Sequence, residues 1–171
     1  MIFGLTMKKR ILTLLLAFLL VANMNSQGVL AVTINFQWLG NQGYTAKGSF
    51  SYDEKTAPTI FSEKGSGKMR VLEDFQVSFY DNSGQEIAKY DNVSEGISSA
   101  NYFQFNFNTK TGQVFGSIDL GGEGMGEIYL QGVVKDNLAL LRVESVDLVM
   151  DEDDSPEIII INPLSIGYIS G

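Results

Sequence analysis

The clearest structural signal in this chain lies in residues 102–120, which read Tyr102-Phe103-Gln104-Phe105-Asn106-Phe107-Asn108, then Thr109-Lys110-Thr111-Gly112, then Gln113-Val114-Phe115-Gly116-Ser117-Ile118-Asp119-Leu120. The three phenylalanines of the first segment fall on one side of a strand, because successive side chains in a strand point to opposite faces. Gly112 can take a positive φ where the chain turns back. The pattern predicts a β-hairpin with one apolar and one polar face.

The same two-residue alternation recurs elsewhere in the chain. Residues 32–39 and 44–52 alternate around a glycine-containing turn, and residues 69–80 and 85–90 alternate around Asp81-Asn82-Ser83-Gly84. Each pair predicts a further hairpin. Residues 53–68 and 91–101 lack a regular period, so we expect loops there, with residues 59–61 as a possible short edge strand.

Further strands are expected after the glycine-rich residues 121–126. Residues 127–134 form one strand, and residues 138–150 form another whose buried face changes near Glu144, as a β-bulge would cause. An acidic loop over residues 151–157 then leads to the apolar residues 158–161. We expect this last segment to be a strand, either buried on both faces or capping a sheet edge.

These segments together predict an all-β fold. We count about eight or nine strands, with turn signals about every 8–12 residues. That spacing favours an antiparallel β-sandwich or jelly roll, with an antiparallel β-barrel as the alternative. Residues 32–171 are expected to form a single domain.

Residues 1–31 are typical of a signal peptide rather than of a folded element. Met7 precedes a basic segment, an apolar run follows over residues 11–22, and residues 29–31 offer a cleavage site. The apolar run is shorter than the ~20 residues that span a bilayer. We therefore expect an exported protein, periplasmic or extracellular, with no stable membrane anchor after cleavage.

Removal of the leader leaves an acidic domain. The chain has 12 basic and 20 acidic residues, and three of the basic ones lie in residues 8–10, so residues 32–171 carry 9 against 20, a net charge of −11. Such a surface repels nucleic acid and anionic lipid and favours cations. A nucleic-acid partner is therefore not expected.

The absence of two residue types excludes several classes of chemistry. The chain contains no Cys and no His. Disulfide stabilisation, Ser-His-Asp and Cys-His catalysis, and thiolate or imidazole zinc sites are therefore excluded. The nine phenylalanines outside the leader must supply much of the stability, at ~1.5–3 kcal/mol for each buried side chain.

The densest charge in the chain makes calcium a candidate ligand. Asp151, Asp153 and Asp154 lie within one acidic stretch, and Ca²⁺ prefers oxygen ligands from such loops. The stretch lacks the order of an EF-hand loop, and adjacent like charges in a loop are commonly only solvated. No other cofactor is expected.

Two further kinds of site are compatible with the composition. Tyr102, Gln104 and Asn106 share the polar face of their strand, and Tyr80 belongs to a similar row, so these residues are candidates for binding a glycan through rings and amides. Carboxylate pairs could also hydrolyse glycosides, but the sequence alone brings no two of them to the required separation.

Two short segments resemble a known group of proteins. Residues 48–53, Gly-Ser-Phe-Ser-Tyr-Asp, and residues 75–81, Phe-Gln-Val-Ser-Phe-Tyr-Asp, are similar to a pattern in exported bacterial β-sandwich proteins that often carry a PEP-CTERM sorting tail. The resemblance implies an exported bacterial β protein and assigns no activity. Residues 166–171 contain no Pro-Glu-Pro motif, so release rather than anchoring is expected.

The sequence therefore leaves three functional hypotheses. The first is a non-catalytic exported β-sandwich with a binding or structural role at or outside the cell envelope. The second is a carbohydrate-binding module, with or without assistance from calcium. The third is a small glycan-acting hydrolase that uses carboxylates. A glycan or another envelope component is the expected partner.

Overall fold

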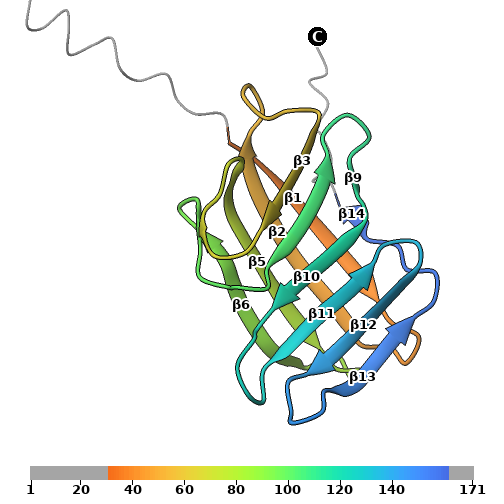
Figure 1. Ribbon diagram of the computed structural model, residues 1–171. Helices are drawn as coiled ribbons and strands as arrows, with labels where there is room; N and C mark the ends of the chain where they lie inside the picture. The colour runs from red at the N-terminus through yellow and green to blue at the C-terminus, as the bar shows by residue number, and fades with distance from the viewer. Residues whose placement is uncertain (1–30, 162–171) are drawn as a thin grey trace, which may run out of the picture. The chain divides into compact units, whose positions relative to one another are not determined.

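The computed structural model describes residues 31–161, which form fourteen strands and no helix (Figure 1). The expected signal peptide, residues 1–31, lies outside the described residues except for Ala31, which begins the first strand. Residues 166–171, in which no sorting motif was found, also lie outside them. Within residues 31–161, no helix is long and apolar enough to cross a bilayer.

The strands form two antiparallel sheets of seven strands each, which confirms the all-β sandwich expected from the alternation. Sheet A has the order β14-β1-β2-β5-β6-β7-β4, with bounds Ile159–Ile161, Ala31–Leu39, Thr45–Asp53, Leu72–Tyr80, Glu86–Ser94, Ile97–Ser98 and Gly67–Lys68. Sheet B has the order β13-β12-β11-β10-β8-β3, with bounds Leu148–Asp153, Asn137–Arg142, Ile128–Val133, Ser117–Gly121, Gln104–Asn108 and Ile60–Lys64, and β9 (Gln113–Val114) pairs with β8.

Phenylalanine is the commonest residue in the core between the two sheets. Phe105 on β8 packs against sheet A, with its ring centroid 4.9 Å from those of Phe50 and Phe75. Phe103 and Phe107 are also buried, so the inward face predicted for residues 102–108 is confirmed. Of the phenylalanines in residues 31–161, only Phe115 is exposed, at 37%.

The hairpin over residues 102–120 has the predicted turn but an interrupted return strand. Gly112 has φ +65° and donates its N–H to the Asn108 carbonyl at 2.8 Å. The chain then pairs with β8 through β9, bends at Gly116 with φ +64°, and continues as β10. Asp119 on β10 lies opposite Gln104 on β8.

Two segments expected to be loops contain strands. Residues 53–68 include β3 and β4, and residues 91–101 include the end of β6 and all of β7. The alternation of apolar and polar residues is hard to recognise in β3, because Glu63 faces inward at a position where an apolar residue is expected. Its buried Oε1 accepts hydrogen bonds from the N–H groups of Arg70 and Val71, at 2.9 and 2.6 Å, which offsets the cost of burying it.

The expectation of a single bulged strand over residues 138–150 is wrong. β12 ends at Arg142, the chain turns, and β13 runs back beside it from Leu148. The change of buried face near Glu144 therefore comes from this reversal. The last strand, β14, lies at the edge of sheet A beside β1, with Ile159 57% exposed, so it caps an edge and is not buried on both faces.

Candidate functional site: a cleft on the outer face of sheet B

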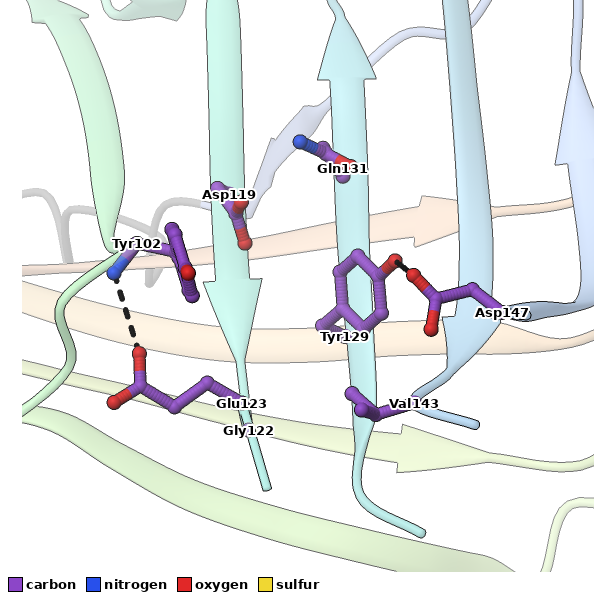
Figure 2. A pocket seen from close by; sticks show the side chains of 8 residues that line it. All are labelled: Tyr102, Asp119, Gly122, Glu123, Tyr129, Gln131, Val143 and Asp147. Carbon is purple, nitrogen blue, oxygen red and sulfur yellow. Dashed lines mark hydrogen bonds between the residues drawn. The ribbon is translucent and has the colours of Figure 1, made fainter. Parts of the chain in front are cut away.

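The outer face of sheet B contains a cleft of about 300 Å³ (Figure 2). Its lining combines two aromatic rings, three carboxylates, one amide and small or apolar positions, from Tyr102, Asp119, Gly122, Glu123, Tyr129, Gln131, Val143 and Asp147. We call these eight residues the sheet B cleft. Its volume lies at the lower end of the range for small-molecule sites.

The residues at the floor of the cleft point outward because side chains alternate between the two faces of β10 and β11. Ile118 and Leu120 on β10 point into the core, so Asp119 between them points outward. On β11 the inward residue Leu130 lies between Tyr129 and Gln131, which point outward. Asp119 is directly opposite Gln131 in the antiparallel pairing of these strands, so both polar groups occupy one part of the sheet.

Glu123 fixes the position of Tyr102 at the rim of the cleft. Its Oε2 accepts hydrogen bonds from the N–H of Asn101 at 2.8 Å and of Tyr102 at 3.3 Å, and its Oε1 accepts one from Asn101 Nδ2 at 2.7 Å. Tyr102 itself is 70% exposed. A large aromatic side chain is therefore held in solvent by contacts to its backbone.

The glycine-rich segment between β10 and β11 is held by a second carboxylate. Glu127 Oε2 accepts hydrogen bonds from the N–H groups of Glu123 and Gly124, at 2.9 and 2.7 Å. A Cβ at Gly122 would lie 2.6 Å from the Glu127 side chain, so glycine is required for this close approach. The segment is therefore an ordered wall of the cleft.

Tyr129 and Asp147 form a hydrogen-bonded pair on the other side. The Tyr129 hydroxyl donates to Asp147 Oδ2 at 2.7 Å, and Asp147 Oδ1 accepts from the Glu144 N–H at 3.2 Å. Burial, followed by the hydrogen bond and the charge of Asp147, raises the pKa of Tyr129 to about 12. Tyr129 therefore stays protonated at neutral pH and keeps donating to Asp147.

Asp119 lies between the rings of Tyr102 and Tyr129 (Figure 2). Burial, with a smaller contribution from the nearby charge of Glu123, raises the pKa of Asp119 to about 6. Both causes disfavour the ionised form of the carboxyl group. Asp119 therefore carries a negative charge in the cleft that the described residues stabilise poorly.

The sequence-predicted glycan residues are divided between the two sheets. Tyr102 lines the cleft, and Gln104 lies beside it, opposite Asp119. Asn106 is 8% exposed, and its Nδ2 donates to the Ser117 carbonyl at 2.6 Å, so its amide is used inside the fold. Tyr80 is on β5 in sheet A, where Lys47 Nζ lies 5.1 Å from its ring centroid.

The three aspartates proposed for calcium have different environments. Asp151 is fully buried in β13, and its carboxylate accepts hydrogen bonds from the N–H groups of Gln42, Tyr44 and Glu152, at 2.9, 3.0 and 2.8 Å. Asp153 accepts one from the Ser155 N–H at 3.0 Å, and Asp154 is exposed. Among residues 31–161, no group of three or more acidic residues is arranged to hold a metal ion.

A second hollow, of about 360 Å³, lies on the outer face of sheet A. Its lining is mostly hydroxyl and carboxylate, as at Ser49, Asp74 and Asp91, and its two aromatic residues, Phe50 and Phe75, belong to the core. It therefore presents no exposed ring to a ligand. The sheet B cleft is the better candidate site because it combines rings with polar groups.

Sequence reasoning missed most of the cleft, although the signal was present. Asp119, Tyr129 and Gln131 are the outward residues of two alternating segments joined by the glycine-rich turn. The pairing across that turn could have been counted from the sequence. The approach of Tyr102 and Asp147 could not, because it depends on the order of strands in the sheet and on the turn after β12.

In comparisons with known proteins, no family model, no curated protein and no solved structure matches this chain. The functional assignment therefore depends on the residues of the cleft themselves.

Proposed function

We propose that this chain is an exported, non-catalytic binding protein that holds a carbohydrate in the sheet B cleft, at or outside the bacterial cell envelope. The observation that carries the proposal is the position of Tyr102 and Tyr129 on either side of a polar floor (Figure 2). Tyr102 is held 70% exposed by hydrogen bonds to its own segment. An exposed ring on a backbone held in this way is favourable for ligand contact, because the segment that carries the ring needs little ordering on binding.

The cleft offers the two kinds of contact that a sugar uses. The apolar faces of pyranose rings pack on aromatic side chains, and the hydroxyls exchange hydrogen bonds with acids and amides. Asp119 and Gln131 lie in register on neighbouring strands and supply such acceptors and donors. Because these residues are on strands, the geometry is set by the sheet and needs little adjustment on binding.

The cellular part of the proposal is supported by the sequence. Residues 1–31 are typical of a signal peptide, and the chain without them has a net charge of −11, which disfavours nucleic acid as a partner. The resemblance of residues 48–53 and 75–81 to exported bacterial β-sandwich proteins supports a periplasmic or extracellular location. Amino-terminal sequencing of secreted material tests cleavage after about residue 31.

A glycan-array screen tests the binding function, followed by titration of any hit. Tyr102→Ala is expected to weaken binding by at least about tenfold, because it removes one ring of the cleft. Tyr80→Ala is the matched control, since it removes a tyrosine from the other sheet. Binding that is unaffected by Tyr102→Ala, or lost equally in the control, would contradict the proposal.

A glycan hydrolase is the second candidate, and the state of Asp119 favours it. A glycosidase needs one carboxyl group with a raised pKa as acid and a second, ionised carboxylate nearby. Burial gives Asp119 a pKa of about 6, and Glu123 and Asp147 line the same cleft. Release of reducing sugar from any bound glycan, abolished by Asp119→Asn, is the expected result; binding without turnover leaves only the first function.

Assistance by calcium is a subsidiary proposal. Of the three aspartates predicted to bind calcium, Asp153 and Asp154 remain partly or fully exposed. If they hold Ca²⁺, the melting temperature rises with added Ca²⁺ and falls with chelator, and the effect is lost in Asp153→Asn. A melting temperature that changes with neither Ca²⁺ nor chelator would contradict calcium binding.

A further inference from the structure

We infer that the sheet B cleft prefers a ligand with a positive charge, such as an amine-bearing sugar, over a neutral or acidic sugar. This inference rests on the proposed binding function and names the class of ligand. It is carried by the arrangement of carboxylates and aromatic rings around Asp119.

Negative charge in the cleft has no positive counterpart in its lining. Asp119, Glu123 and Asp147 contribute three carboxylates, and among the described residues that line the cleft none is Lys or Arg. Lys64 lies on the same outer face, opposite Gln104, and is therefore two strands away from Asp119. At about 4.8 Å between neighbouring strands, its backbone is about 10 Å from that of Asp119.

The three carboxylates differ in what already satisfies them. Glu123 accepts hydrogen bonds from Asn101 and Tyr102, and Asp147 accepts them from Tyr129 and Glu144. Within residues 31–161, no group donates a hydrogen bond to the Asp119 carboxyl, and burial and Glu123 raise its pKa to about 6. Asp119 is therefore the carboxylate with acceptor capacity left for a ligand.

An ammonium group complements this position better than a hydroxyl does. It would donate charge-assisted hydrogen bonds to Asp119, which are about twice as strong as neutral ones. The rings of Tyr102 and Tyr129 lie on either side of Asp119, and their faces attract cations (Figure 2). A uronic acid would instead place a fourth carboxylate beside the three of the cleft.

The test is calorimetric titration of the secreted, processed protein with three oligosaccharides of equal length at neutral pH. These are a glucosamine oligomer, its N-acetylated form and a uronic acid oligomer. The glucosamine oligomer is expected to bind about tenfold or more tightly than the acetylated one, and the uronic acid oligomer more weakly than both. High salt is expected to weaken only the glucosamine complex strongly.

Two variants locate the effect. Asp119→Asn is expected to reduce the ratio of the glucosamine affinity to the acetylated affinity to near one. Asp91→Asn removes the same charge from the outer face of sheet A and is expected to keep that ratio. Equal binding of the charged and acetylated oligomers by the unmodified protein overturns this inference but leaves the proposed function intact, whereas no binding of any of the three sugars overturns both.

Discussion

The side chain of Asn92 on β6 pairs with the backbone of Gly121 on β10 and so joins the two sheets. Asn92 Nδ2 donates to the Gly121 carbonyl at 2.7 Å, and the Gly121 N–H donates to Asn92 Oδ1 at 2.9 Å. Asn92 is 3% exposed. The amide occupies the place of a strand partner and anchors the start of the glycine-rich wall of the cleft.

Loss of this pair is expected to destabilise the fold. Asn92→Ala leaves the N–H and the carbonyl of Gly121 without partners, which costs about 1–3 kcal/mol. Urea unfolding measures the change, with the exposed Asn82→Ala as control. A loss no greater than that of Asn82→Ala would show that solvent satisfies the Gly121 backbone.

Asp151 is expected to be required for stability rather than for a ligand. Its carboxylate accepts three backbone hydrogen bonds, two of them from the turn between β1 and β2. Asp151→Ala removes all three and should lower the free energy of unfolding by about 3–5 kcal/mol. Asp154→Ala, at an exposed neighbour, should change it by no more than about 0.5 kcal/mol.

Because the pKa of Asp119 is raised, ionisation of this residue is expected to lower the free energy of unfolding as the pH rises. The folded chain binds this proton more tightly than an unfolded chain with a pKa of 3.8, so stability from this group is present at low pH and is lost between about pH 4 and pH 6. Screening of the partly exposed group limits the effect to about 1 kcal/mol. Asp119→Asn should therefore gain stability relative to the unmodified protein between those pH values; parallel pH profiles would contradict this.

Tyr129 should ionise later than an ordinary tyrosine. Its pKa is raised to about 12, whereas the usual value is 10.0. Absorbance titration should contain a phenolate phase near pH 12 that is missing in Tyr129→Phe. The variant is needed for the assignment because burial also raises the pKa of Tyr52 and of Tyr90.

Trp38 provides a test of the core. It is the single tryptophan of the chain, it is fully buried, and its Nε1 has no hydrogen-bond partner among the described residues. Its emission should be shifted to the blue in the folded protein and should move to the red on unfolding. The transition should coincide with that seen by circular dichroism, as a two-state domain requires.

The sequence predicted the sheets better than it predicted the site. Alternation identified the inward faces of β1, β2, β5 and β8 because each of these strands has one apolar and one polar side. At β3 it indicated only a short edge strand over residues 59–61, because the buried Glu63 interrupts the pattern further on. It failed at residues 143–147, where a turn looks like a change of face. Tyr102 was identified as a candidate because the alternation of residues 102–108 puts it on their polar side, although it lies just before β8. Asp147 reaches the cleft only through tertiary structure.

All eight residues of the cleft fall between positions 102 and 147, whereas most of sheet A comes from positions 31–98. The ligand selectivity proposed for the cleft would thus be encoded in one contiguous portion of the chain. A library randomised only at the outward positions of that portion should yield variants with altered ligand choice, since the scaffold beneath them would keep its own amino acids.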